Sequence, residues 1–211
     1  MRSSEPKSAA AVERWIEKHN RTSDRFAYVA DKYAPHRKQH GCYDVYPSSN
    51  GVWLGALAAA AKTLRLLEVG CGLGYSALWL AYGAGPKAQV ESIEADNEHA
   101  KIARTHFKAE GLQQRISVLV GEAASVLPKL KSRYDLIYFD TAPAVSLTVL
   151  EQSERLLRKG GLLVSANLFL GSVNPHIPGL EKTAEYRLRI LDTDTWLTAY
   201  IADGTAISVR Q

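Results

Sequence analysis

The chain has 211 residues, of which 46% are hydrophobic and 23% are charged. These are the values of an ordinary globular domain, so they exclude a largely disordered chain, a collagen-like repeat and a disulfide scaffold. The formal net charge of +4 is mild. Its excess lies in residues 1–50, which hold nine Lys or Arg and six Asp or Glu. The length predicts a single domain over residues 1–211.

Cysteine content and apolar runs indicate the compartment. Cys42 and Cys71 belong to no CxxC pair and cannot form a disulfide framework. The chain begins with the polar segment MRSSEPKS instead of the apolar run of a secretory signal. The longest apolar stretch, residues 52–61, is too short to span a bilayer and indicates a buried helix. We therefore expect a soluble, cytoplasmic protein.

The first 62 residues are predicted to be largely helical. Residues 9–19 carry apolar side chains at helical spacing, residues 24–33 form a weaker helix, and residues 51–62 are rich in Ala and Leu. Residues 34–50 contain two prolines, a glycine and a Ser-Ser-Asn run, so we expect a loop there. Residues 1–50 thus form a helical cap ahead of the rest of the domain.

Apolar runs of strand length alternate with helical segments in the central part of the chain. Five strands are predicted, over residues 65–69, 89–94, 116–120, 134–140 and 162–166. Four helices are predicted between them, over residues 75–82, 97–110, 123–130 and 147–157, the last stopped by Lys159-Gly160-Gly161. This alternation predicts a parallel sheet with helices on both faces.

The C-terminal part has a different pattern. A loop over residues 171–178 and a helix near 179–191 precede two apolar runs, 196–201 and 205–209, which flank Asp203-Gly204. Asp-Gly between apolar runs is a strong hairpin signal. The predicted fold class is therefore α/β: a Rossmann-like, doubly wound, mostly parallel seven-stranded sheet with a C-terminal antiparallel hairpin and extra N-terminal helices.

A glycine-rich loop follows the first predicted strand. It runs Glu68-Val69-Gly70-Cys71-Gly72-Leu73-Gly74-Tyr75-Ser76 and leads into a helix. Ligands bind where such loops leave the carboxyl edge of a parallel sheet, and glycines let the backbone approach them closely. The spacing is GxGxG, whereas dinucleotide binders have GxGxxG. Glu68 at the strand end suits a cationic partner.

Two further strand ends carry matching signals. Glu94 lies 20 residues after Gly74, at the end of the second strand, where a carboxylate can accept both hydroxyls of a ribose. Gly121-Glu122-Ala123 follows the third strand, and an adenine ring could lie against its small side chains and amides. In this order, the three strand ends predict a site for an adenosine-containing ligand.

Six segments then resemble one known family. They are LLEVGCGLGYS (66–76), VESIEA (90–95), VLVGEA (118–123), YDLIYFD (134–140), LLRKGGLLVSAN (156–167) and IADGTAISVR (201–210). They are similar to the S-adenosylmethionine-dependent O-methyltransferases of the catechol and caffeoyl-CoA type. The resemblance covers about residues 40–211 and implies a class I methyltransferase domain with a cofactor-binding part over residues 51–211.

The resemblance also implies which residues hold the cofactor. In this family S-adenosylmethionine would be bound by residues at the strand ends and in the cap, which here are Tyr46, Glu68, Gly70, Cys71, Gly72, Gly74, Tyr75, Ser76, Glu94, Ala95, Gly121, Glu122, Ala123 and Asp140. Tyr46 would lie near the sulfonium. The family further implies a small-molecule acceptor and a homodimer. We expect no membrane partner, and a nucleic-acid partner stays open.

The family's metal site is incomplete in this chain. Such enzymes commonly hold a divalent cation with an aspartate after the fourth strand and an Asp-Asn pair after the fifth. Asp140 and Asn167 are present, but Ala166 replaces the second aspartate and Pro143 replaces the lysine that often acts as the base. Hard cations need carboxylate charge. We therefore predict that a metal is weakly bound or unused, with Asp140 and Asn167 as its ligands only if a weak site survives.

Without a metal, another group must accept the acceptor's proton. Besides Asp140 and Asn167, His40 and His176 are predicted as catalytic residues, and His36 is a further candidate base. The remaining histidines, which are expected to face solvent, are His19, His99 and His106.

Three other functions fit parts of the pattern. A nicotinamide oxidoreductase shares the sheet and the acidic residue of the second strand. A cofactor-binding protein that has lost catalysis would explain Ala166 and Pro143. A tRNA-modifying methyltransferase would use the basic first 50 residues, which could otherwise favour an anionic small acceptor.

Overall fold

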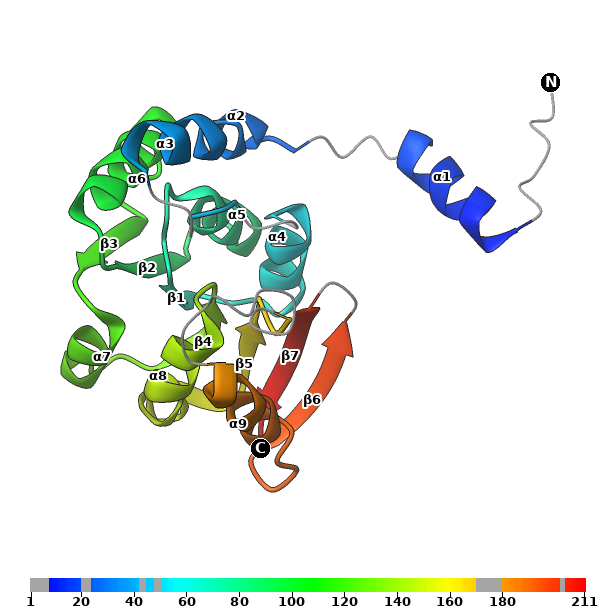
Figure 1. Ribbon diagram of the computed structural model, residues 1–211, viewed down its shortest axis with the longest axis vertical. Coiled ribbons are helices and arrows are strands. Elements are labelled where there is room, and N and C mark those ends of the chain that lie inside the picture. Colours follow the sequence, from blue (N-terminus) through cyan, green and yellow to red (C-terminus); the bar gives the residue numbers. More distant parts are fainter. Residues whose placement is uncertain (1–7, 20–23, 42–44, 48–50, 170–179, 202–203) are drawn as a thin grey trace.

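The computed structural model describes residues 8–19, 24–41, 45–47, 51–169, 180–201 and 204–211. Its centre is a seven-stranded sheet in the order β3-β2-β1-β4-β5-β7-β6 (Figure 1). The strands are β1 (Arg65–Val69), β2 (Gln89–Glu94), β3 (Ile116–Val120), β4 (Tyr134–Phe139), β5 (Leu157–Ser165), β6 (Trp196–Ile201) and β7 (Thr205–Arg210). β1 to β5 run parallel, and β7 pairs antiparallel with both β5 and β6. The predicted fold class is thereby confirmed.

Helices cover both faces of the sheet. All the helices of the described residues except α1 take part; the helices are α1 (Ala9–His19), α2 (Ala27–Ala30), α3 (Tyr33–His40), α4 (Gly51–Ala60), α5 (Tyr75–Ala84), α6 (Asn97–Ala109), α7 (Ala123–Val126), α8 (Pro143–Leu156) and α9 (Leu180–Ile190), with a 3-10 turn at Leu127–Lys129. One buried cluster joins the sheet to α4, α5, α6 and the α2–α3 segment. The second joins it to α7, α8 and α9. Because both faces are covered, the central strands β1 and β4 are buried at almost every position.

The segment before α4 differs from the prediction. Residues 34–41 were expected to be loop, but Tyr33–His40 is helical, and the expected helix over 24–33 is reduced to the single turn of α2. Pro35 lies in the first turn of α3, where a missing N–H breaks no helical hydrogen bond. Gly41 then ends the helix in the left-handed conformation with φ 65°.

Two other element boundaries were also wrong. β5 begins at Leu157, so Gly160 and Gly161 lie inside the strand instead of before it. The pairing of β4 with β5 shifts register between Tyr134 and Leu136, which absorbs the two glycines as an irregularity in the ladder. α8 begins at Pro143, since proline is well suited to the first position of a helix.

α1 stands apart from the other helices (Figure 1). Its apolar residues are exposed: Val12 to 38%, Trp15 to 42% and Ile16 to 53%. The helix is as predicted, but it leaves an apolar stripe in contact with water. Among the described residues, no helix has the length and apolar character needed to cross a membrane.

Candidate active site

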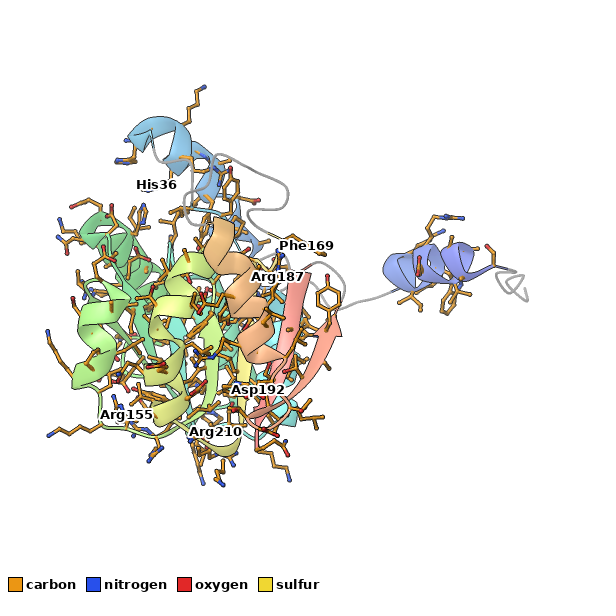
Figure 2. All side chains as sticks on the ribbon, turned by 60° about the horizontal axis from the view of Figure 1, so that its bottom comes forward. His36, Arg155, Phe169, Arg187, Asp192 and Arg210 are labelled. Atoms are coloured by element: carbon orange, nitrogen blue, oxygen red, sulfur yellow. The ribbon has the colours of Figure 1, made fainter. Side chains whose placement is uncertain are left out.

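The sequence signals converge at the edge where the parallel strands end. After β1 the chain turns toward β2 and β3, and β4 and β5 lie on the other side of β1, so the strand order reverses between β1 and β4. Ligands of open α/β sheets bind at such a reversal. Figure 2 shows His36, Phe169 and Arg187 toward this end of the molecule, and Arg155, Asp192 and Arg210 toward the opposite end.

The glycine-rich loop leaves β1 close to the end of β4. Gly70 has φ 96°, and a Cβ at this position would lie 2.4 Å from the carbonyl oxygen of Asp140. The Asp140 N–H donates to the Val69 carbonyl at 3.0 Å. Only glycine combines this backbone conformation with such a close approach. The loop and the Asp140 segment therefore form one continuous wall of the site.

Side chains hold the amides of this loop. The Gly72 N–H donates to Oε2 of Glu94 at 2.7 Å, and the Leu73 N–H donates to the hydroxyl oxygen of Tyr33 at 3.0 Å. The Gly70 and Cys71 N–H groups both donate to the carbonyl of Ile93. The sequence predicted Glu94 at this place, but it offered no signal for Tyr33, which lies 40 residues from its partner.

Glu68 is buried at the end of β1 with one oxygen unpaired. Oε2 accepts a hydrogen bond from the Ser92 hydroxyl, whereas Oε1 has no partner among the described residues. Burial raises the pKa of the Glu68 carboxyl to about 8, although hydrogen bonds from Ser76 and Ser92 oppose the shift. An unpaired buried carboxyl oxygen is costly unless a ligand satisfies it. A cationic group is the partner that would stabilise its ionised form.

Glu94 lies beside the same loop at the end of β2. Oε1 of Glu94 also accepts the Asp96 N–H at 2.9 Å. Glu94 is 8% exposed. Nδ1 of His99 lies 3.6 Å from Oε1. Both carboxylate oxygens thus lie within the site, where they can accept the two neighbouring hydroxyls of a ribose.

A group of histidines borders Glu94. The ring of His36 on α3 lies 4.9 Å from that of His99 on α6 and 4.4 Å from that of His40. Nε2 of His36 and Nδ1 of His99 are buried and have no hydrogen-bond partner among the described residues. Burial lowers the pKa of His36, helped by the neighbouring His99 and His40. His36 and His40 are therefore on the β2 side of β1, away from the Asp140 side.

Two histidines are not where they were expected. His99 and His106 were predicted to face solvent, but they are 6% and 4% exposed. Nδ1 of His106 lies 2.8 Å from the carbonyl oxygen of Leu73, so His106 also contacts the glycine-rich loop. Burial lowers the pKa of His106. The prediction failed because residue type and helix position do not reveal that the α2–α3 segment lies over this face of α6.

Asp140 and Asn167 meet across the ends of β4 and β5. The Asn167 amide donates to Oδ1 of Asp140 at 2.7 Å, and Asn167 adopts the left-handed conformation with φ 62°. Burial raises the pKa of Asp140 to about 6, against hydrogen bonds from Asn167 and Tyr138 that lower it. Ala166 adds no ligand atom. Within the described ranges, no three His, Cys, Asp or Glu side chains are grouped so that they could hold a metal ion.

The other predicted site residues take various positions. The Tyr75 hydroxyl donates to Oδ2 of Asp24 at 2.5 Å, so it is held by the cap. Tyr46 is 60% exposed, with the Arg37 guanidinium 4.0 Å from its ring centre. Cys71, Gly74, Ser76 and Ala123 are buried, Gly121 is half-buried, and Ala95 and Glu122 are exposed. His176 lies outside the described residues.

Sequence comparisons identify a family. A family profile described as O-methyltransferase matches residues 34–196. A catechol O-methyltransferase of Mycobacterium tuberculosis is 34% identical over 125 residues, which are 59% of this chain and 57% of that protein. A putative O-methyltransferase of Mycobacterium ulcerans is 31% identical over 168 residues, 76% of this chain and 75% of that protein. The chain thus spans little more than half the length of the M. tuberculosis relative.

Solved structures share the fold. An O-methyltransferase from Bacillus cereus in complex with SAH has a TM-score of 0.75 at 21% identity, covering 95% of this chain and 97% of that one. The O-methyltransferase of tomaymycin synthesis from Streptomyces achromogenes, in complex with SAM, has a TM-score of 0.76 at 22% identity, covering 95% and 96%. At these identities the likeness concerns the fold alone.

Proposed function

The chain belongs to the O-methyltransferase family, and on that premise we propose that it transfers a methyl group from S-adenosylmethionine to an oxygen of a small-molecule acceptor. The reaction class is that of EC 2.1.1. The unpaired Oε1 of Glu68 beside the glycine-rich loop carries the proposal, because a buried carboxyl group of this kind fits the ammonium group of the cofactor's methionine part.

Each strand end binds a different part of the cofactor. Glu68 pairs with the ammonium group, Glu94 accepts the ribose hydroxyls, and residues 121–123 lie against the adenine. S-Adenosylmethionine supplies an electrophilic methyl group on a sulfonium. The hydrogen-bonded pair of Asp140 and Asn167 would orient the acceptor hydroxyl toward that methyl group, and the Asp140 carboxylate would receive the hydroxyl proton.

A divalent cation is not part of the proposal. The pair of Asp140 and Asn167 offers one carboxylate and one amide, and their side chains are already hydrogen bonded to each other. Mg²⁺ prefers several oxygen ligands with carboxylate charge. Deprotonation of the acceptor would therefore depend on the protein's own groups.

The loop amides argue against a nicotinamide cofactor. A pyrophosphate binds the free N–H groups of a glycine-rich loop and the helix that follows it. Here the Gly72 and Leu73 N–H groups already donate to Glu94 and Tyr33, and the carboxylate of Glu94 would repel a phosphate. Both features favour an uncharged ribose over a diphosphate.

Equilibrium binding tests the proposal. Isothermal titration should show that S-adenosylhomocysteine, the product of methyl transfer, binds in the micromolar range, whereas NAD shows no binding at millimolar concentration. Radiolabelled S-adenosylmethionine offered with a panel of catechols, phenols and carboxylic acids should then label at least one acceptor. Binding of NAD instead of S-adenosylhomocysteine would overturn the cofactor assignment. Binding without any methyl transfer would indicate a protein that has lost catalysis.

A homodimer in the cytoplasm completes the proposal. The exposed side chains of Val12, Trp15 and Ile16 on α1 form an apolar stripe that a second copy could cover. β6 is an edge strand whose Leu197 is 66% exposed. Light scattering after size exclusion should give twice the chain mass of 23.2 kDa, and Trp15→Glu should shift the protein toward the monomer.

A further inference from the structure

The hydroxyl group of Tyr33 enters the glycine-rich loop from outside the sheet. Tyr33 opens α3 and is 2% exposed. Its hydroxyl oxygen accepts the Leu73 N–H at 3.0 Å and also the main-chain N–H of Tyr75, the first residue of α5. A Cβ at Gly72 would lie 3.1 Å from this oxygen and 3.3 Å from the ring. The phenol ring therefore fills the space that the missing side chain of Gly72 leaves.

The loop needs such an anchor because of its own sequence. Gly70, Gly72 and Gly74 have φ angles of 96°, 51° and 92°. A segment with three alternating glycines has high conformational entropy when it is free, so its geometry must be imposed by the surroundings. The hydrogen bonds to Glu94, Tyr33 and His106 impose it from three directions.

These anchors are not equivalent once a ligand is bound. The Glu94 carboxylate holds the Gly72 amide and is also the proposed acceptor of the ribose hydroxyls, so its hydrogen bonds must be shared with the ligand. Tyr33 is not among the residues proposed to contact the ligand, and its hydroxyl oxygen already accepts the amides of Leu73 and Tyr75. It holds the loop by a contact that does not depend on the ligand.

The cap segment that carries Tyr33 is itself firmly seated. Phe26 and Val29 are completely buried. Asp24 accepts hydrogen bonds from the Tyr75 hydroxyl at 2.5 Å and from Nε1 of Trp79 at 3.2 Å, both on α5. The packing of residues 24–41 thus reaches α5 through Asp24 and reaches the loop directly through the Tyr33 hydroxyl.

We propose that Tyr33 is a positioning residue of the cofactor site: its hydroxyl holds loop 70–74 in the conformation that receives the cofactor and thereby couples cofactor affinity to the seating of residues 24–41. The inference rests on the proposed function. It gives the cap a second link to the cofactor site besides Tyr46, the cap residue that the family resemblance places near the sulfonium.

A matched pair of variants tests the inference. Tyr33→Phe removes the hydroxyl at the loop. Tyr28→Phe removes a hydroxyl from the same segment, one that donates to Oε1 of Glu110 at the C-terminal end of α6 at 2.8 Å, and it keeps the ring that packs against His106. In ligand-free Tyr33→Phe protein the Leu73 amide should exchange its hydrogen about tenfold faster than in the wild type, since a buried amide loses its partner. In Tyr28→Phe the rate should be unchanged.

Cofactor binding provides the second readout. Tyr33→Phe should weaken S-adenosylhomocysteine binding about tenfold and raise KM for S-adenosylmethionine by the same factor. Its kcat at saturating cofactor should stay within about twofold of the wild type, because Tyr33 touches no reacting atom. A general loss of structure would lower kcat as well. Equal affinities in the wild type and Tyr33→Phe, or equal losses in both variants, would overturn the inference.

If Tyr33→Phe does not fold, hydrogen exchange of the wild-type protein still tests the coupling. Hydrogen exchange with and without S-adenosylhomocysteine should show residues 24–41 gaining protection together with residues 70–74. Protection of the loop alone would refute the coupling. A wild type that binds no S-adenosylhomocysteine would instead refute the proposed function, and the exchange rate of the Leu73 amide in ligand-free protein would still report on Tyr33.

Discussion

The two ends of the sheet differ in whether their polar groups are paired: at one end they are hydrogen bonded, and at the other several buried atoms have no hydrogen-bond partner. At the end where the parallel strands begin, Asp135 accepts the N–H groups of Leu64 and Arg65 and pairs with Arg158. Arg155 donates to the carbonyls of residues 127 and 130, and Arg210 to those of residues 154 and 157. Figure 2 shows Arg155 and Arg210 together at this end.

At the end where these strands finish, buried polar atoms are left over. Of the four buried side-chain N or O atoms without a hydrogen-bond partner in the described part of the chain, three lie here: Oε1 of Glu68, Nε2 of His36 and Nδ1 of His99. The fourth, Nε1 of Trp196, lies at the start of β6. Native proteins rarely leave such atoms unpaired. One end of the sheet therefore stabilises the fold, and the other is arranged for a ligand.

The largest expected effect comes from removing the charge at the ligand end. Glu68→Gln keeps the size of the side chain but cannot form an ion pair with the cofactor's ammonium group. We expect S-adenosylhomocysteine affinity at pH 8 to fall about 10- to 100-fold, the range of a hydrogen bond to a charged group. Isothermal titration measures it. Unchanged affinity would mean that the unpaired oxygen has another purpose.

The pH dependence of binding tests the same group. The raised pKa of about 8 leaves Glu68 largely protonated at neutral pH in the free protein, so pairing with a cation releases a proton. Affinity should therefore rise about fivefold from pH 7 to pH 8 and about tenfold in all from pH 7 to the plateau above the pKa. In Glu68→Gln this rise should disappear; if the variant keeps it, another group is responsible.

Stability without ligand should follow the opposite course. The unfolded chain loses the Glu68 proton near the ordinary pKa of 4.5, whereas the folded protein keeps it up to about 8. The folded state thus binds more protons over this window, and its free energy of unfolding falls as the pH rises from about 4.5 to 8. Asp140, with a pKa of about 6, adds the same trend between 3.8 and 6. Urea unfolding at pH 5 and pH 8 checks that the free energy of unfolding falls with rising pH. In Glu68→Gln the fall between about pH 6 and pH 8 should be smaller.

A substitution at the end where the parallel strands begin should lower stability and leave cofactor affinity unchanged. Asp135→Ala removes the acceptor of two main-chain amides and the partner of Arg158. The free energy of unfolding should fall by about 1–3 kcal/mol. Affinity for S-adenosylhomocysteine should not change, because Asp135 lies at the opposite end of β4 from Asp140. A loss of affinity without a loss of stability would contradict the assignment of stability to this end of the sheet and ligand binding to the other.

The smallest expected effect is that of a chelator. With Asp140 and Asn167 as its only candidate ligands, a metal contributes little, so EDTA should change the methyl-transfer rate by less than about twofold. Rates are measured with and without EDTA and after adding back Mg²⁺. Full loss on chelation that Mg²⁺ restores would show that the acceptor or residues outside the described ranges complete a metal site.

Much of the fold followed from local patterns. Short apolar runs between helical segments predicted the parallel strands, and Asp203-Gly204 predicted the terminal hairpin. Glu68, Glu94 and the glycines were placed correctly at one edge because the ends of parallel strands must meet there. Local rules failed at α3, where Pro35 was taken for a loop residue, and at Gly160 and Gly161, which the strand ladder absorbs.

Local patterns in the sequence were enough for the succession of strands and helices along the chain and for the residue types at the ligand edge, since these depend on periodicity and on turn chemistry within a few residues; the order of the strands in the sheet came from the structure. Only the tertiary structure decided which of those residues are buried and which are paired. Tyr33 reaches Leu73, His106 reaches the same residue, and Glu68 keeps one free oxygen. Such facts depend on contacts between segments tens of residues apart, which no local pattern encodes.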